Sequence, residues 1–198
     1  FMGIPEPELT PNVRNAIVVL TQEVENLRGE VERANSRLAH VERLADEDAL
    51  VPIRNRRAFM REMSRVISYN ERYNAVSSLI YFDLNNFKEI NDKYGHAMGD
   101  LTLLHAANSL INNLRASDLL GRLGGDEFGV ILKRTNAEQA LLKGRDLAWA
   151  IQATPVEYED SKLTITASYG VTMFKPGETA QDTINAADRA MFERKKAL

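Results

Sequence analysis

The most constraining stretch of this chain is a glycine-centred segment, residues 119–132, with apolar runs on both sides. The runs 119–123 and 127–132 have the length and composition of paired strands. Gly124 and Gly125 stand between them, and we expect this pair to supply the positive φ angles of a tight turn. The segment therefore predicts a β-hairpin.

Two acidic residues, Asp126 and Glu127, follow the glycine pair. Adjacent carboxylates repel each other unless a cation lies between them. A third carboxylate, Asp83, ends another apolar run, the VSSLIYFDL of residues 76–84. Carboxylate oxygens are hard ligands that suit Mg²⁺ better than zinc. These residues predict a divalent-cation site, provided that the fold brings Asp83 to the hairpin.

The order of the predicted elements indicates that the fold brings Asp83 to the hairpin. We expect helices and strands in the following order: a helix over 56–69, a strand over 76–84, a short helix over 87–93, a helix over 100–114, the hairpin, a helix over 137–151, a strand over 163–172 and a helix over 180–196. Without the flanking helices this is the β-α-β-β-α-β order of ferredoxin-like folds, of the α+β class. In that topology the first strand and the hairpin are neighbours at the sheet centre.

A heptad repeat precedes this core. Apolar residues recur at the a positions Ile17, Val24, Val31 and Leu38 and at the d positions Leu20, Leu27, Ala34 and Val41. β-Branched residues at most a positions, with leucine at two d positions, favour a parallel two-stranded coiled coil. The alternative is a single amphipathic helix packed on its own domain, but the apolar stripe is narrow and the other faces are polar.

The chain therefore divides into three parts. Residues 1–12 are expected to be a loose leader that begins with a cloning remnant, Phe1-Met2-Gly3. Residues 13–46 are expected to form a coiled-coil helix that makes a homodimer, and residues 47–198 a catalytic domain.

Composition excludes several classes of function. A net charge of −3 in 198 residues argues against a general nucleic-acid binder. The sequence has no cysteine, so disulfides and thiolate metal sites are excluded. No apolar run is long enough to span a bilayer, so we expect no membrane segment in this fragment and a cytoplasmic location.

Three further polar residues suggest a nucleotide site. Lys88 lies near the start of the 87–93 helix, where anions bind well. Carboxylates, a divalent cation and a placed lysine are typical of phosphoryl or nucleotidyl transfer. Asn91 and Asp100 flank a Gly95-His96 turn. A carboxylate can accept from two guanine N–H groups, and an amide can engage guanine O6 or N7. Each residue alone is more often solvated surface.

Together these residues closely resemble the GGDEF family of diguanylate cyclases. The matching motifs are Asn55-Arg56-Arg57, the block from Asp83 to Asp92, the block from Gly95 to Asp100, Arg115-Ala116-Ser117-Asp118, Gly124-Gly125-Asp126-Glu127-Phe128, Ser168-Tyr169-Gly170-Val171 and the block from Ala187 to Phe192. The resemblance covers about residues 46–198 and leaves the heptad repeat outside. It implies a nucleotide cyclase-like form of the ferredoxin-like core.

The resemblance implies condensation of two GTP molecules into cyclic di-GMP with release of two pyrophosphates. Each of two facing domains would hold one GTP. Metal ligands for Mg²⁺ or Mn²⁺ would be Asp83, the Leu84 carbonyl, Asp126 and Glu127. Asp126 or Glu127 would accept the hydroxyl proton, and Lys88 would be the other catalytic residue. Substrate would contact Phe87, Lys88, Asn91, Asp100, Gly124, Gly125 and Lys195.

Arg115 and Asp118 precede the glycine pair by the spacing of the family's product-inhibition site, where cyclic di-GMP would bind. From the residues alone this is a helix-end arginine–aspartate surface pair of little energetic weight. Some positions depart from the family pattern. Asn85 stands where a second aspartate is common, Val51-Pro52 replaces a Thr-Gly, Phe192 a usual tyrosine and Arg194 a usual alanine.

Two other classes of function compete with an active cyclase. One is a catalytically silent receptor that binds cyclic di-GMP through Arg115 and Asp118. The other is a structural dimerisation module, which accounts for the coil but not for the acidic cluster. Incubation with GTP and magnesium followed by separation of the products distinguishes the three.

Overall fold

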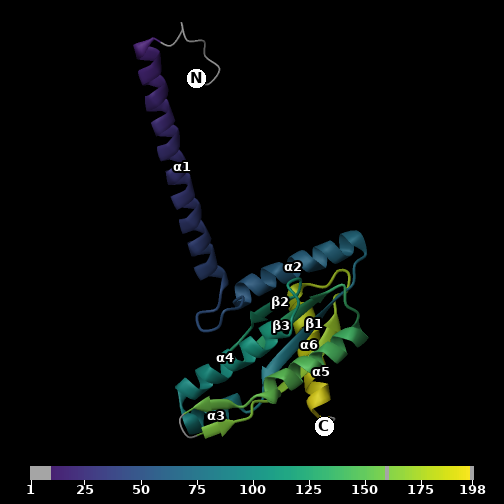
Figure 1. Cartoon of the computed structure of the whole chain (residues 1–198). Helices are drawn as coiled ribbons and strands as arrows, with labels where there is room; N and C mark the ends of the chain where they lie inside the picture. Colours follow the sequence, from purple (N-terminus) through teal and green to yellow (C-terminus); the bar gives the residue numbers. More distant parts are fainter. Residues whose placement is uncertain (1–9, 159–160, 197–198) are drawn as a thin grey trace. The chain divides into compact units, whose positions relative to one another are not determined.

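The computed structural model of the chain describes residues 10–158 and 161–196, without the side chains of 38–40 and 42–44 (Figure 1). Most of the expected leader, 1–12, lies outside the described residues. By their internal contacts the residues form two compact units, Phe1–Ala45 and Asp46–Leu198. Each unit is described by itself.

In its described residues the first unit is one helix, α1 (Pro11–Asp46). In the single chain its described heptad residues are largely uncovered: Val24, Leu27 and Val31 expose about half of their surface, 47%, 50% and 58%. None of the helices in the described residues is both long enough and apolar enough to cross a membrane. The parallel coiled coil remains a prediction.

The second unit contains the predicted core with one additional hairpin. Its elements are α2 (Arg56–Tyr73), β1 (Ser77–Leu84), α3 (Phe87–Tyr94), α4 (His96–Asn112), β2 (Leu119–Arg122), β3 (Glu127–Lys133), α5 (Ala137–Ala153), β4 (Val156–Tyr158), β5 (Ser161–Leu163), β6 (Ala167–Met173) and α6 (Ala180–Lys196). The main sheet has the order β2-β3-β1-β6. All of its neighbouring strands are antiparallel. The α+β, ferredoxin-like prediction is confirmed, with β1 and β3 at the centre.

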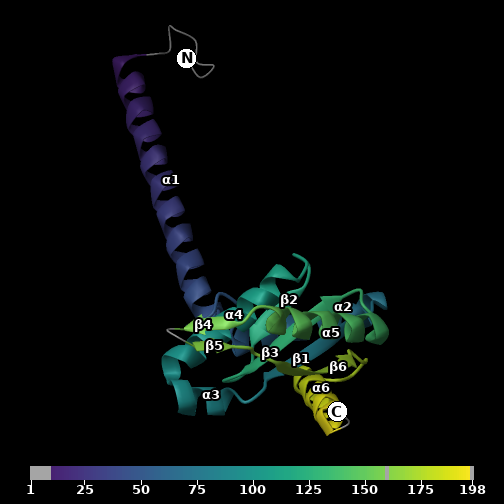
Figure 2. The same ribbon diagram turned by 60° about the horizontal axis from the view of Figure 1, so that its bottom comes forward.

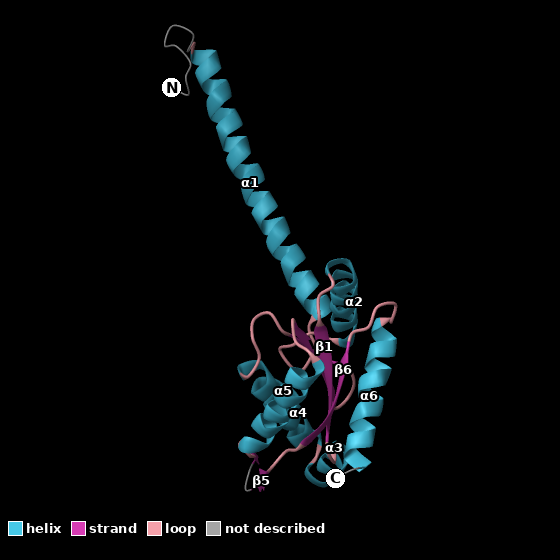
Figure 3. Ribbon diagram, turned by 90° about the vertical axis from the view of Figure 1, so that its right-hand side faces the viewer, coloured by secondary structure: helices cyan, strands magenta, loops and turns pink. Residues whose placement is uncertain are grey.

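Helices cover both faces of this sheet (Figure 3). Side chains alternate along β1, so Ile80, Phe82 and Leu84 point to the α4 and α5 layer, whereas Leu79 and Tyr81 point to α2 and α6. The Asp83 side chain lies on the same face of β1 as Leu79 and Tyr81, which is the face covered by α6. The residues of β1 are almost completely buried from Ser77 to Phe82, which fixes the register of the strand that ends in the candidate site.

Local sequence explains where the flanking helices begin. The Asn55 side chain caps α2 by accepting a hydrogen bond from the Ala58 N–H at 3.0 Å. α5 begins with a capping box in which Asn136 and Gln139 bond each other's backbone N–H groups. Between α3 and α4 the chain turns at Gly95, whose φ of 82° suits glycine.

Two details of the sequence prediction are wrong. The strand predicted over 163–172 begins only at Ala167, because Ser161–Leu163 pairs instead with Val156–Tyr158 as a separate hairpin, β4–β5, that packs near α4 (Figure 2). The second concerns Gly124 and Gly125, which do not have positive φ angles. Four residues, 123–126, connect β2 to β3, and a connection of that length does not need the positive φ of a two-residue turn.

Candidate active site

The ends of β1 and β3 bring the predicted acidic residues together. Asp83 is the direct cross-strand partner of Glu127. One residue further, the Leu84 N–H donates to the carbonyl oxygen of Asp126 at 3.1 Å. Directly opposed residues have Cβ atoms about 5 Å apart. The topology therefore places Asp83, Leu84, Asp126 and Glu127 together where the two central strands meet the loops at one end of the sheet, as the sequence predicted.

Asp83 experiences a strongly negative environment. Burial raises the pKa of its carboxyl, the neighbouring Asp126 raises it further, and Glu127 adds to the effect. Lys195 of α6 opposes the shift, with Nζ 3.6 Å from the Asp83 Oδ1. A half-buried carboxylate with two acidic neighbours and one partly exposed lysine favours binding of an additional cation.

Glu127 points toward Tyr81 and Gly124. Burial raises the pKa of the Tyr81 hydroxyl above its ordinary value, and the negative charge of the nearby Glu127 carboxylate raises it further. A Cβ built on Gly124 would collide with the Glu127 carboxylate, whereas one on Gly125 would meet nothing within 4 Å. The need for glycine at Gly124 therefore comes from this close approach rather than from its backbone angles.

The acidic residues do not form a ready three-ligand metal centre. In residues 10–158 and 161–196, no three carboxylate, histidine or cysteine side chains are grouped to hold an ion. The Glu127 carboxylate lies against Gly124, and Lys195 lies against Asp83. The donor set nevertheless fits a hard divalent cation, because carboxylates and backbone carbonyls are its usual ligands. We expect Asp83 to exchange Lys195 for a cation.

The two predicted guanine-reading residues lie on adjacent helices. Asn91 is in α3, half-buried, and Asp100 is an exposed residue in the first turns of α4. Gly99 allows the two helices to approach, since a Cβ built there would overlap the Asn91 amide. Glycine at this position thus leaves room for the Asn91 side chain to pack against the beginning of α4, the helix that also carries Asp100.

The remaining predicted substrate contacts lie around the same end of the sheet. Lys88 is exposed in the first turn of α3, and Phe87 is half-buried against the main core. The residue before that helix, Asn86, has a left-handed φ of 59° and makes no side-chain cap. The first N–H groups of α3 therefore have no side-chain cap from Asn86, and Lys88 belongs to the same first turn.

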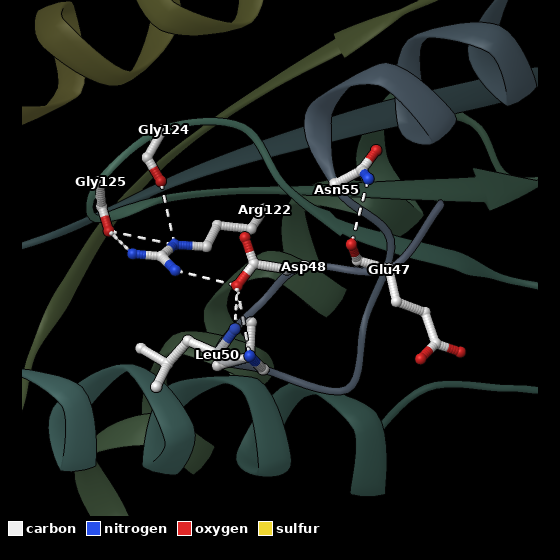
Figure 4. Close-up of polar contacts among 8 residues, drawn as sticks. Glu47, Asp48, Leu50, Asn55, Arg122, Gly124 and Gly125 are labelled. Carbon is white, nitrogen blue, oxygen red and sulfur yellow. Dashed lines mark hydrogen bonds and ion pairs between the residues drawn. The ribbon is translucent and has the colours of Figure 1, made fainter. Parts of the chain in front are cut away.

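Two residues that sequence reasoning missed hold the glycine loop in place (Figure 4). The Arg122 guanidinium donates through Nε to the Gly124 carbonyl at 3.1 Å and through Nη2 to the Gly125 carbonyl at 2.7 Å. Its Nη1 lies 3.0 Å from Asp48 Oδ1, which also accepts from the N–H groups of Leu50 and Val51 at 3.0 and 3.2 Å. An arginine two residues before the glycine pair was the only available signal.

Arg115 and Asp118 lie in the loop that joins α4 to β2. The Asp118 carboxylate accepts from the Arg115 backbone N–H at 3.1 Å, and the Asp118 N–H donates to the Arg115 carbonyl at 3.0 Å. No ion pair joins their side chains in the described part of the chain. Arg115 is exposed and lines a pocket of about 610 Å³ together with Arg65 and Arg134. The arginine is free to bind an anion.

Comparison with known proteins agrees with this arrangement. The family profile "Diguanylate cyclase, GGDEF domain" matches residues 45–198. Diguanylate cyclase DgcP of Pseudomonas aeruginosa is 30% identical over 192 residues, which is 97% of this chain and 29% of that protein. Diguanylate cyclase TpbB of the same species is 31% identical over 179 residues, 89% of this chain and 40% of that protein. The chain thus spans less than half the length of these two curated relatives.

Solved structures extend the likeness to the N-terminal helix. The coiled coil and GGDEF domain of DgcB from Caulobacter crescentus, in complex with c-di-GMP, matches with a TM-score of 0.81 and 26% identity over 90% of this chain and 95% of that one. Diguanylate cyclase SiaD of P. aeruginosa, in complex with its activator SiaC, matches with a TM-score of 0.74 and 29% identity over 93% and 75% of the two chains. The profile match and the curated relatives, together with the acidic residues at the ends of β1 and β3, show that this chain belongs to the GGDEF diguanylate cyclase domain family.

Proposed function

We propose that this domain binds GTP and that two copies, facing each other, condense two GTP molecules into cyclic di-GMP and two pyrophosphates. One observation carries the proposal: Asp83 stands opposite Glu127 in register, with Asp126 hydrogen-bonded through its backbone to Leu84. The relatives named as diguanylate cyclases support the same reaction.

A divalent cation, Mg²⁺ or Mn²⁺, would be held by Asp83, Asp126, Glu127 and the Leu84 carbonyl. When bound, it would neutralise charge on the phosphates and polarise the α-phosphate. The acidic environment that raises the pKa of Asp83 supports this assignment, because a cation relieves that repulsion.

The chain's own residues would orient the nucleotide. Asp100 would accept from guanine N1–H and N2–H, and the Asn91 amide would bind the guanine O6 or N7 edge. Adenine lacks that pair of donors, so the arrangement favours GTP over ATP. The contact between Asn91 and Gly99 supports this role because it packs the amide against the beginning of α4, the helix that carries Asp100.

The phosphates would lie between α3 and the glycine loop. Lys88, beside Phe87 at the start of α3, and Lys195 at the end of α6 would neutralise their charge. The backbone of Gly124 and Gly125 would approach the nucleotide closely. Lys195 would turn from Asp83 to phosphate as the cation binds.

Bond formation needs two domains. The 3′-hydroxyl oxygen of one GTP would attack the α-phosphorus of the other, pyrophosphate would leave, and Asp126 or Glu127 would take the hydroxyl proton. A second attack in the reverse direction closes the ring. Residues 13–46, as a parallel coiled coil, would raise the effective concentration of one catalytic domain, 47–198, for the other.

We further propose that Arg115 and Asp118 form an inhibitory site for the product. The exposed Arg115 guanidinium and its basic neighbours Arg65 and Arg134 suit a cyclic dinucleotide phosphate or guanine edge. The bond between Asp118 and the Arg115 N–H fixes the loop that carries both residues. Arg115→Ala should relieve inhibition by added cyclic di-GMP without lowering the initial rate.

The direct test is pyrophosphate release from GTP with and without magnesium, with chromatography of the nucleotide products. We expect magnesium-dependent cyclic di-GMP formation that falls by at least about a hundredfold in Asp126→Ala. Asp146→Ala, which removes an exposed carboxylate of α5, is the matched control and should keep the initial rate. Cyclic di-GMP binding without turnover in the wild-type chain would instead identify a silent receptor and refute the proposal.

A further inference from the structure

A second pocket, separate from the guanine-reading residues, lies between α5 and α6 beside the edge strand β6. Its volume is about 340 Å³, at the lower end of the range for small-molecule sites. The lining side chains that matter here are Asn85, Arg145, Trp149, Tyr169, Arg194 and Lys195. We call this the α5–α6 pocket.

The charge of the α5–α6 pocket is positive. Arg145, Arg194 and Lys195 line it, and among the residues that the structure describes no carboxylate does. Arg145 has one acidic neighbour, Asp146, at 3.4 Å, but both side chains of that pair are more than half exposed, so it neutralises little. Arg194 has no ion pair among the residues that the structure describes. The pocket therefore favours an anion.

The tyrosine of the pocket has an unused hydrogen-bonding group. Tyr169 is only 6% exposed, and its hydroxyl has no hydrogen-bond partner in the described residues. Arg194 lies over the ring face, with Cζ 4.4 Å from the centroid. Burial raises the pKa of this hydroxyl, while the charges of Arg194 and Arg145, which line the same pocket, lower it. A buried hydroxyl without a partner is costly unless a ligand satisfies it.

The floor of the pocket is held rigidly. Ser168 donates through Oγ to Asn85 Oδ1 at 2.7 Å, and Asn85 Nδ2 donates to Thr166 Oγ1 at 3.0 Å. Asparagine at position 85 can bridge the two hydroxyls as both acceptor and donor, which a carboxylate could not do. This network keeps the wall beside Tyr169 in one arrangement.

An aromatic side chain lies at the rim. Trp149 leaves 70% of its surface exposed, although large aromatic side chains are normally well buried. An indole ring beside a basic, hydrogen-bonding pocket offers a stacking surface for a planar base.

We propose that the α5–α6 pocket binds a phosphorylated planar anion of the nucleoside monophosphate class. The phosphate lies between the Arg145 and Arg194 guanidinium groups and accepts from the Tyr169 hydroxyl, and the base stacks on Trp149. This site goes beyond the proposed cyclase reaction, because Asn91 and Asp100 do not line it. Lys195 connects the two sites, since it lines the pocket and also lies 3.6 Å from Asp83.

The experiment uses the intrinsic fluorescence of the full chain, in which Trp149 is the single tryptophan. AMP is titrated in the presence of a metal chelator, so that no turnover occurs. Its adenine base lacks the N–H groups that the guanine-reading residues would bind, so AMP does not suit that site. We expect a saturable change in fluorescence. Inorganic phosphate should bind at least tenfold more weakly, and adenosine without phosphate should give no saturable change. Equal binding of phosphate and AMP would refute stacking on Trp149.

Variants test which groups hold the anion. Arg194→Gln should weaken AMP binding about tenfold, as expected for a lost charged hydrogen bond. Tyr169→Phe keeps the ring and its packing, and should weaken binding severalfold. Arg115→Gln and Asp100→Ala are matched controls outside the pocket and should leave binding unchanged. The proposal is overturned by the absence of a saturable change, by full AMP affinity in both pocket variants, or by loss of the signal in either control.

Discussion

Asp48 and Arg122 form an ion pair between the segment that follows α1 and the strand that leads into the glycine loop. Their Oδ1 and Nη1 atoms are 3.0 Å apart, and the two side chains are only 18% and 17% exposed. The same guanidinium bonds the Gly124 and Gly125 carbonyls. The glycines have no side chains, and in the described part of the chain this arginine supplies the side-chain hydrogen bonds to their carbonyls, so the position of the loop depends in part on it.

We predict that Asp48→Asn destabilises the domain by about 1–3 kcal/mol, because a half-buried guanidinium loses its charged partner. Turnover of GTP should fall together with stability, since the glycine loop loses its support. Urea unfolding and pyrophosphate release measure the two effects. Asp146→Asn removes an exposed carboxylate beside an arginine and should change neither. Equal stability of Asp48→Asn and the wild type would contradict the role assigned to the pair.

The pair also predicts a pH dependence. Burial acts to raise the pKa of Asp48, but the Leu50 N–H, the Arg122 guanidinium and the Val51 N–H together hold it below its ordinary value. A carboxyl whose folded pKa is lowered stabilises the fold above its unfolded pKa of about 4 and loses that contribution as pH falls through the folded pKa. The stability difference between wild type and Asp48→Asn should therefore be constant from about pH 5 to 7, where the Asp48 carboxyl is ionised in both the folded and the unfolded state. It should shrink at lower pH. Unfolding curves at several pH values test this, and a difference that grows on acidification would exclude it.

The glycine pair offers a matched comparison. A Cβ on Gly124 would meet the end of the Glu127 side chain, whereas a Cβ on Gly125 would meet open space. Gly124→Ala should displace the Glu127 carboxylate, which is flexible, at a cost of less than about 1 kcal/mol in stability. Its turnover should nevertheless fall about tenfold or more, as expected when an acidic group near the reacting atoms is moved. Gly125→Ala should retain wild-type stability and leave the Glu127 carboxylate in place.

Ultraviolet titration of tyrosine distinguishes the two alanine variants. In Gly125→Ala the pKa of Tyr81 should stay raised by burial and by the Glu127 carboxylate, as in the wild type. In Gly124→Ala one tyrosine should titrate at lower pH, because the carboxylate has moved away. Identical titrations of the two variants would show that Glu127 does not depend on Gly124.

A fourth prediction concerns guanine recognition. Gly99→Ala should displace the Asn91 amide, since the added Cβ overlaps it. We expect KM for GTP to rise about tenfold with a smaller change in kcat, because one hydrogen bond to the base is lost. Ala97→Ser, at an exposed position of the same helix, is the control. A large fall in kcat at unchanged KM would argue against a role in base binding.

The order of elements and the acidic strand ends could be predicted from the sequence because both depend on local patterns. The apolar run that ends at Asp83 and the glycine pair before Asp126 are strand and loop signals, and the β-α-β-β-α-β order then dictates which strands are neighbours. The expected site residues of β1, β3 and α3 consequently lie together at one end of the two central strands. Their roles as metal, phosphate and guanine ligands remain predictions.

Other features depend on contacts between residues far apart in sequence. Asp48 and Arg122 are separated by 74 positions, and no periodicity relates them. The prediction of positive φ angles for the glycine pair was wrong. The β2–β3 register leaves a four-residue connection, which does not need them. The β4–β5 hairpin was missed because strands of three residues give little periodic signal. The α5–α6 pocket depends on side chains of α5, β6 and α6 that only the packing brings together.

The heptad repeat of α1 gives the last prediction, which tests dimerisation rather than the site. Ile17, Val24 and Leu27 are a and d residues, and the last two are about half exposed in the single chain, 47% and 50%. Replacing each by glutamate places like charges at a dimer interface, so the proposed coil should dissociate. Specific activity should then fall about tenfold or more at dilute protein and recover as concentration rises, because two domains must meet. Gln22→Glu, at an f position away from the stripe, should behave as the wild type. Sedimentation measures the oligomeric state in parallel, and a specific activity that stays constant on dilution of the triple variant would show that the heptad residues do not bring the catalytic domains together.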